Sequence, residues 1–355
     1  TTEIYTLSLH DALPILLVKG TAGLGNRIFA LVTAILYARI SGRVLAVDWR
    51  DRYYSSDGEN VFFELFEIKN TPFIETIPES ASIYPNLWQG RMDESISQVI
   101  AKDVGLLDTM GQAVLRKYAY DVRNLTYSEE IVIGTGYTEE IDRLRSVFLN
   151  EYRHFKNTPK GIIFRETFHQ HLRLTPTIQE RIESFRRQNF ADQPTIGIHI
   201  RQSDKAISYS WYKRALAHHV ERYPNARIFL ATDNRDVETE ISRLYPNVSM
   251  VDKWLPTPGV KAHGNKTCPD LKEHAIEALL DLFLLTSCDH LIYSRTTSFG
   301  LLASYISLAP VENHFDIQLY NDRRKKGLKE KVETIQRKIE HAYKYCMGLI
   351  KLGDS

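Results

Sequence analysis

The stretch TIGIHIRQSDK, from Thr195 to Lys205, is an apolar, β-branched run that ends in ionisable side chains. Such a run is typical of a buried strand. Alternate residues of a strand point to the same face, so we expect His199 and Arg201 to lie together. The planar donors of Arg201 suit phosphate oxygens, and Asp204 could orient them. The alternative is a structural Arg–Asp pair beside a buried histidine.

Strands and helices alternate on both sides of this stretch. A helix is predicted from Thr175, as N-cap, with Pro176 at its first position. Such alternation is typical of a doubly wound α/β domain. The further helices are predicted over 211–224, 236–246, 271–288 and 297–307, and the further strands over 226–233, 248–252 and 290–294.

The N-terminal part begins with a second strand–helix–strand unit. Leu16 to Lys19 is a short apolar strand, the helix that follows ends at Gly42, and the next strand ends near Asp48. This order favours a parallel sheet. Residues from about 55 to 155 are less regular, as expected for insertions that shape an acceptor cleft.

The glycine-rich segment GTAGLGNR follows the first strand. It is not a phosphate-binding P-loop, because Asn26 and Arg27 replace the required lysine and hydroxyl residue. It is also a poor dinucleotide fingerprint, because Ile28 occupies the third glycine position. What remains is a helix N-terminus that attracts anions, with Gly23, Gly25 and Asn26 at the ligand. The alternative is a tight turn without a ligand.

Ligands of open α/β sheets bind beyond the carboxyl ends of the strands. This rule places Asp233, Asn234 and the segment SRTTSFG (294–300) at the same rim as Arg201. The three hydroxyls of Thr296, Thr297 and Ser298, with the backbone N–H groups there, could bind phosphate, although ordinary N-capping explains one of them.

Asp281 lies inside the apolar helix segment EALLDLFLL. A buried carboxylate needs a partner, and the N1–H and N2–H groups of guanine would supply one. The alternative is an acid exposed to solvent.

The composition excludes several classes of protein. Lys and Arg number 45 against 44 Asp and Glu, so no global charge favours nucleic acid, and any anion must be held locally. The three scattered cysteines, Cys268, Cys288 and Cys346, give neither a metal spacing nor a disulfide framework. We therefore expect a reducing cytoplasm. No apolar run reaches the roughly 20 residues of a membrane span, so none is expected.

The two ends of the chain differ from the rest. Residues 1–15 (TTEIYTLSLHDALPI) resemble a translated sequencing adapter, and we expect them to be non-native. Apolar residues recur between Leu328 and Leu352 at spacings of four and three. That pattern fits a helix that packs on its own domain, or a short coiled coil that joins a homodimer.

Four motifs in order resemble the NodZ-type fucosyltransferases, which are related to the α1,6-, α1,2- and protein O-fucosyltransferases. They are GLGNRIFALVTAILYARISGRVLAVDWRD, HIRQSDK, ATDN and the SCD…YSRTTSFG segment, and they span Leu16 to Leu308. The resemblance implies a GT-B-like fold, in which two Rossmann-like domains face each other across a cleft. It also implies an inverting transfer of fucose from GDP-fucose to a glycan hydroxyl, with no metal or other cofactor.

The resemblance also implies roles for individual residues. Arg201 would stabilise the leaving GDP with His199 beside it, and Asp204 would hold the arginine. Without a metal, a cation must offset the charge that develops on the leaving group. The residues that would bind the donor are Gly23, Gly25, Asn26, Arg201, Lys205, Asp233, Asp281, Thr296, Thr297, Ser298 and Phe299.

The chain departs from the family pattern at two positions. Gln202 stands where a second arginine is common, and Tyr209 stands where the α1,6-type enzymes have a glutamate as candidate base. The general base is therefore open, and His199, Asp48 and Asp51 are the candidates.

The predicted domains are an N-terminal α/β acceptor-side domain over 16–175, a GDP-sugar domain over 176–310 and a helical segment over 311–355. Three other functions stay open at this point. They are a transferase that uses another GDP-sugar, an NAD-dependent dehydrogenase that uses the glycines and Asp48, and a non-catalytic nucleotide- or glycan-binding protein.

Overall fold

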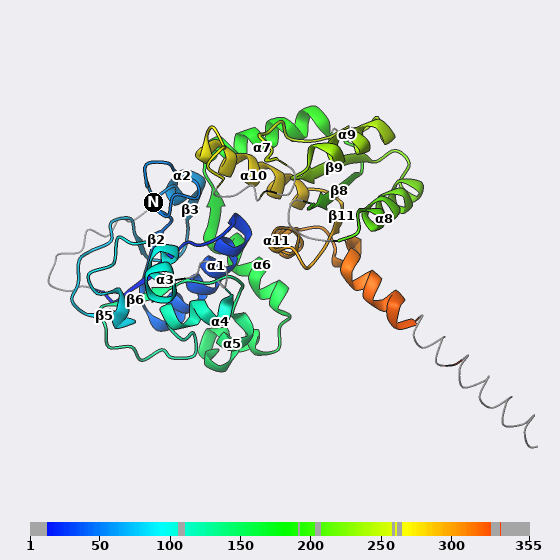
Figure 1. Cartoon of the computed structure of the whole chain (residues 1–355). Coiled ribbons are helices and arrows are strands. Elements are labelled where there is room, and N and C mark those ends of the chain that lie inside the picture. The colour runs from blue at the N-terminus through cyan, green and yellow to red at the C-terminus, as the bar shows by residue number, and fades with distance from the viewer. Residues whose placement is uncertain are drawn as a thin grey trace, which may run out of the picture.

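The computed structural model describes residues 13–105, 111–190, 192–202, 207–257, 260, 265–327 and 334. Within these residues the chain forms two five-stranded sheets, each parallel throughout and flanked by helices (Figure 1). The prediction of an α/β protein with two Rossmann-like sheets is confirmed.

The N-terminal sheet has the order β4-β2-β1-β6-β5. Its strands are β1 (Ile15–Lys19), β2 (Val44–Asp48), β4 (Phe73–Ile74), β5 (Ile83–Tyr84) and β6 (Ile131–Gly134). The first strand thus begins at Ile15, the last residue of the segment expected to be non-native, and residues 1–12 of that segment lie outside the described residues. Strand β6 lies within the irregular region and pairs with the central β1.

The C-terminal sheet has the order β10-β9-β8-β11-β12. In chain order this is third, second, first, fourth and fifth, as in doubly wound nucleotide-binding folds, and the switch point lies beside β8. Its strands are β8 (Thr195–Ile200), β9 (Arg227–Thr232), β10 (Val248–Ser249), β11 (His290–Tyr293) and β12 (His314–Asp316). The strand predicted over 248–252 is shorter than expected, because only its first two residues pair with β9.

Helix α1 (Leu24–Ser41) packs along the first sheet and ends at Gly42, whose φ of 69° suits glycine. By length and composition α1 could cross a membrane, but 78% of the relevant window is buried inside the protein, as in a core helix. The other elements of this half are short. They are α2 (Phe62–Leu65), β3 (Phe66–Ile68), α3 (Ile96–Val104), α4 (Gln112–Leu115), α5 (Ile141–Leu144) and turns of 3₁₀ helix at 86–88, 116–118, 145–147 and 150–156.

The helices of the C-terminal half lie close to their predicted positions. They are α7 (Pro176–Asn189), α8 (Tyr209–Arg222), α9 (Arg235–Leu244), α10 (Leu271–Thr286) and α11 (Ser298–Ile306). Thr175 precedes α7 as predicted, but its side chain makes no cap. Instead, the Thr175 hydroxyl donates to the carbonyl of Glu64 at 3.0 Å.

Helix α6 (Lys160–His171) joins the two halves. It continues into β7 (Leu172–Leu174), which pairs antiparallel with β3. The rings of Phe29 in α1, Phe164 in α6 and Tyr305 in α11 contact one another, with centroids 5.3 to 5.9 Å apart. Because one apolar core runs through these helices into both halves, the packing holds the two sheets together. The domain boundaries at 175 and 310 stay a prediction.

Candidate active site

A cavity of about 650 Å³ lies where the two halves meet. From the C-terminal half it is lined by the carboxyl ends of β8 and β9 and the first turn of α11, which is the switch point of that sheet. The N-terminal half contributes the start of α1, the loop before α5 and the start of α6. The predicted residues that line it are Gly23, Gly25, Asn26, His199, Arg201, Asp233, Asp281, Thr296, Thr297, Ser298 and Phe299.

Arg201 follows β8 directly and is 18% exposed at its side chain. Its Nε lies 3.9 Å from Oδ2 of Asp233, which follows β9, and Asp233 Oδ1 accepts a hydrogen bond from the backbone N–H of Gln202 at 2.9 Å. The predicted partner Asp204, and Lys205, lie outside the described residues. Asp233 is thus a carboxylate that can orient the arginine.

His199 is 7% exposed, and its ring packs on Phe299 with centroids 5.0 Å apart. Burial, together with the charges of Arg201 and Lys253, lowers the pKa of His199 to about 3. The imidazole is therefore neutral at pH 7, so Arg201 has no cationic neighbour in this strand. A group with this pKa is also a poor proton acceptor, which counts against His199 as the base.

The glycine-rich loop approaches α11 closely. A Cβ on Gly25 would lie 3.1 Å from the carbonyl carbon and from Oγ of Ser298. A side chain here would crowd α11, so the glycine favours this close contact between the two halves, which the sequence interpretation did not anticipate. Arg27, 1% exposed, fixes the loop from behind, since its Nε donates to the carbonyl of Ala22 at 2.9 Å and its Nη2 pairs with Asp51 at 2.5 Å.

The two aspartates considered as bases are both engaged elsewhere. Asp48 pairs with Lys19 at 2.6 Å and with Arg50 at 2.9 Å. Burial works against ionisation of Asp48, but these two cations lower its pKa to about 2. Asp51 pairs with Arg27, and burial raises its pKa. Neither aspartate lines the cavity, so both have structural roles.

Asp281 is paired with a residue that the sequence interpretation missed. Lys253 Nζ lies 2.5 Å from Asp281 Oδ2, and the side chains are 5% and 9% exposed. Burial raises the pKa of Asp281. Its Oδ1 has no hydrogen-bond partner within the part of the chain that the structure describes. Lys253 follows the short strand β10, so the carboxyl-end rule could have found it.

The first turn of α11 uses its hydroxyls unequally. Thr297 is the N-cap, since its Oγ1 accepts from the N–H of Gly300 at 3.3 Å and donates to the carbonyl of Ser294 at 3.0 Å. Thr296 shares a hydrogen bond with the hydroxyl of Ser294. The first N–H groups of any helix lack intrahelical partners and attract anions. The turn therefore offers backbone donors and Ser298 to a ligand.

The described residues contain no group of three or more His, Cys, Asp or Glu side chains placed to hold a metal. The charged groups that line the cavity are Lys160, Arg201, Lys253 and Arg295 against Glu139, Asp233 and Asp281. The arrangement suits an anionic ligand in the C-terminal half.

The chain is similar to known proteins over most of its length. Residues 163–328 match the family model described as Nodulation protein Z (NodZ). The matched residues are called the NodZ-type segment below. The resemblance to the NodZ-type fucosyltransferases predicted from the motifs is thus confirmed.

Two relatives are Nodulation protein Z of Bradyrhizobium diazoefficiens and of Azorhizobium caulinodans. The chain is 24% identical to the first over 302 residues, which cover 78% of this chain and 74% of the relative. It is 24% identical to the second over 337 residues, which cover 84% and 89%.

A crystal structure of NodZ alpha-1,6-fucosyltransferase soaked with GDP-fucose is also similar. The TM-score is 0.56 at 20% identity, and the match covers 83% of this chain and 92% of the other. A mutant of Arabidopsis thaliana FUT1 in complex with GDP matches with a TM-score of 0.51 at 15% identity, over 84% and 69% of the two chains. At these identities the likeness establishes the fold, and the predicted GT-B-like fold class is confirmed.

Proposed function

We propose that this protein transfers fucose from GDP-fucose to a saccharide hydroxyl, with inversion at the anomeric carbon and without a metal ion. The observation that carries the proposal is the position of Arg201. It lies at the switch point of the C-terminal sheet, in the same cavity as the first turn of α11 and inside the NodZ-type segment. The similar NodZ structures are named for a fucosyltransferase and for GDP-fucose.

In this proposal the diphosphate lies between Arg201 and the first turn of α11. When the bond from the anomeric carbon to the β-phosphate breaks, negative charge develops on the phosphate oxygen. In this arrangement the guanidinium and the backbone N–H groups are donors that the fold fixes beside that charge, and they lower its energy. Asp233 holds the guanidinium, and His199 and Phe299 form an uncharged wall beside it.

The guanine would lie near Asp281. Oδ1 of this carboxylate has no partner in the described part of the chain and can accept from N1–H or N2–H. Lys253 holds the other oxygen and supplies the opposite charge that a buried carboxylate needs. We therefore assign recognition of the guanine to Asp281 and Lys253.

Titration calorimetry of the full chain with GDP, GDP-fucose, GDP-mannose and NADH, in the presence of EDTA, tests the proposal. We expect GDP to bind, NADH not to bind, and GDP-fucose to release GDP in the presence of a saccharide such as chitotetraose. Binding of NADH without GDP would favour the dehydrogenase. Binding of GDP without turnover of any GDP-sugar would favour a non-catalytic protein.

The linkage and the anomeric configuration follow from NMR of the product. The NodZ structure is named an alpha-1,6-fucosyltransferase, and we propose the same linkage here. We also propose a cytoplasmic location, because Cys268 and Cys288 are free cysteines. Homodimer formation through the C-terminal helix stays a prediction. The helix predicted between Leu328 and Leu352 lies outside the described residues, apart from position 334.

A further inference from the structure

The wall of the cavity formed by the N-terminal half carries a carboxylate that the sequence interpretation missed. Three carboxylates of the described residues line the cavity, namely Glu139, Asp233 and Asp281. Asp233 lies beside Arg201, and Asp281 is paired with Lys253, both in the C-terminal half. Glu139 comes from the loop between β6 and α5, so it faces the cavity from the other side.

Glu139 is held in place by two contacts. Its Oε1 lies 2.6 Å from Nζ of Lys160, and its Oε2 accepts from the backbone N–H of Ile141 at 3.1 Å. The Glu139 side chain is 8% exposed, and Lys160 lines the same cavity. An ionised carboxylate has about four acceptor positions, so both oxygens can still accept a proton or a further hydrogen bond.

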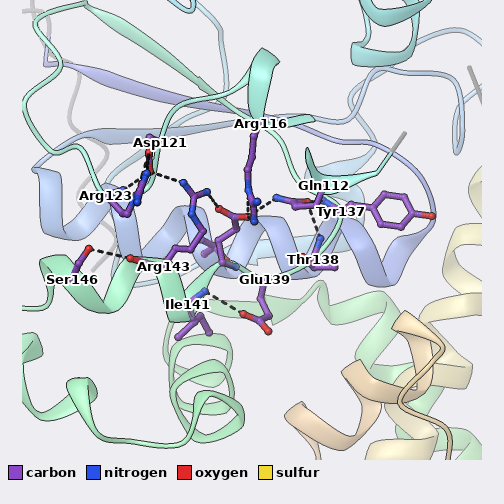
Figure 2. A network of polar contacts seen from close by, with 12 residues as sticks. Gln112, Arg116, Asp121, Arg123, Tyr137, Thr138, Glu139, Ile141, Arg143 and Ser146 are labelled. Atoms are coloured by element: carbon purple, nitrogen blue, oxygen red, sulfur yellow. Dashed lines mark hydrogen bonds and ion pairs between the residues drawn. The ribbon is translucent and has the colours of Figure 1, made fainter. Parts of the chain in front are cut away.

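A polar network fixes the loop that carries Glu139 (Figure 2). Gln112 Oε1 accepts from the backbone N–H groups of Tyr137 at 2.6 Å and Thr138 at 3.3 Å. Gln112 Nε2 donates to the carboxylate of the adjacent Glu140 at 2.9 Å, and Arg116 and Arg143 pair with the same carboxylate. Because its neighbours on both sides are anchored, Glu139 has a defined position.

Inversion requires the acceptor to attack the anomeric carbon from the face opposite the leaving group. If the diphosphate is held by Arg201 and α11 in the C-terminal half, that face would be turned toward the N-terminal half, which lines the other side of the cavity. We propose that Glu139 is the general base, which takes the proton from the acceptor hydroxyl, and that Lys160 is its positioning residue. This inference rests on the proposed function.

The acceptor oxygen forms the new bond to the anomeric carbon, and its proton passes to a carboxylate oxygen of Glu139. The bond from the anomeric carbon to the β-phosphate oxygen breaks, and GDP leaves with the electron pair. The neutral Glu139 then returns the proton to water.

The Glu139→Gln variant tests the base. A general base contributes about 10² to 10⁴-fold, so release of GDP from GDP-fucose with water or chitotetraose as acceptor should fall at least 10²-fold. Calorimetric GDP binding should be unchanged. Azide carries no proton, so formation of fucosyl azide, measured by mass spectrometry, should proceed in the variant at least as fast as in the wild type.

Asp142→Asn is the matched control. Asp142 lies 3.4 Å from the same Lys160 Nζ and does not line the cavity, so this variant should keep wild-type turnover. If Glu139→Gln keeps its turnover with water and chitotetraose, or loses azide turnover equally, Glu139 is not the base. If the wild type releases no GDP with any acceptor, the proposed function fails and the base assignment fails with it.

The role of Lys160 is tested by comparing the kinetic constants of two variants. Lys160→Met should lower kcat with saccharide about 10-fold, within the scale for a misplaced catalytic group, and leave the KM for GDP-fucose and azide turnover unchanged. Lys160→Arg keeps the charge and should restore most of kcat. Equal losses in both variants, with azide turnover lost as well, would make Lys160 a structural residue only.

Discussion

Each of the two sheets has a cation after its first strand and a carboxylate after the neighbouring strand, but the two pairs differ in burial and in what surrounds them. In the N-terminal sheet, Lys19 ends the first strand and Asp48 ends its neighbour. The two groups lie 2.6 Å apart, and their side chains are 3% and 5% exposed. In the C-terminal sheet, Arg201 and Asp233 follow the equivalent strands, 3.9 Å apart, with 18% and 19% exposure.

This difference separates a structural rim from a binding rim. At the N-terminal rim the lysine also donates to the carbonyl of Met92, and Arg50 donates to Asp48, so the buried charges satisfy one another. At the C-terminal rim the arginine lines a cavity of about 650 Å³. Charged residues at strand ends therefore indicate where the rim of a sheet lies. Whether they pair with each other or line a binding cavity depends on the packing around them.

The largest expected effect lies at the structural rim. Asp48→Asn leaves Lys19 buried without its carboxylate, and breaking a buried pair costs about 3–5 kcal/mol. We expect the free energy of unfolding in urea to fall by that amount while GDP affinity at low temperature stays unchanged. If turnover fell by 10²-fold in a variant of unchanged stability, Asp48 would be catalytic after all.

Arg201→Ala is the corresponding change at the binding rim. Loss of a main donor to the developing charge should lower kcat by about 10² to 10³-fold, with little change in the free energy of unfolding. Arg201→Lys should restore only part of kcat, because the planar fork is lost. Steady-state kinetics with GDP-fucose measure both. If Arg201→Ala kept full activity, Arg201 would be a structural residue, as Lys19 is.

Sequence reasoning located the binding rim because its residues follow strands of strong periodicity. Arg201, Asp233 and the first turn of α11 come directly after β8, β9 and β11, where the carboxyl-end rule applies. Lys253 directly follows the strand predicted over 248–252, so the same rule covered it, but its pairing with Asp281, 28 residues further along the chain, is not visible in the sequence.

Glu139 was missed for a different reason. It belongs to a loop with no period, in the region that matched no motif, and its place at the cavity depends on Gln112 and Glu140. The contact of Gly25 with Ser298 joins residues far apart in the chain. Local patterns carry no information about such long-range contacts.

The buried histidine of the binding rim gives a pH effect of intermediate size. The pKa of His199 is about 3 in the folded state against 6.5 for the free side chain, so the unfolded state binds the proton first. Its contribution to stability is complete above pH 6.5 and is lost as pH falls toward 3, at about 1.4 kcal/mol per pH unit.

Between pH 6.5 and pH 5 the loss should therefore be about 2 kcal/mol, measured as the difference in urea stability between wild type and His199→Asn. The exposed His218 provides the control, since His218→Gln should keep the wild-type slope. Equal slopes in wild type and His199→Asn would mean that His199 is protonated in the folded protein, and Arg201 would then have a cationic neighbour.

The smallest expected effect concerns two neighbouring hydroxyls of the binding rim, one that caps helix α11 and one that we expect to contact the ligand. Thr297 and Ser298 both line the cavity, but the Thr297 hydroxyl is already used by the N–H of Gly300 and the carbonyl of Ser294. Thr297→Ala should lower the free energy of unfolding by about 1 kcal/mol, the usual value of an N-cap, and change GDP affinity by less than about 3-fold. Ser298→Ala should show the opposite pattern in calorimetry and urea denaturation. A tenfold loss of GDP affinity in Thr297→Ala, equivalent to about 1.4 kcal/mol, would show that this hydroxyl binds phosphate and that α11 is capped without it.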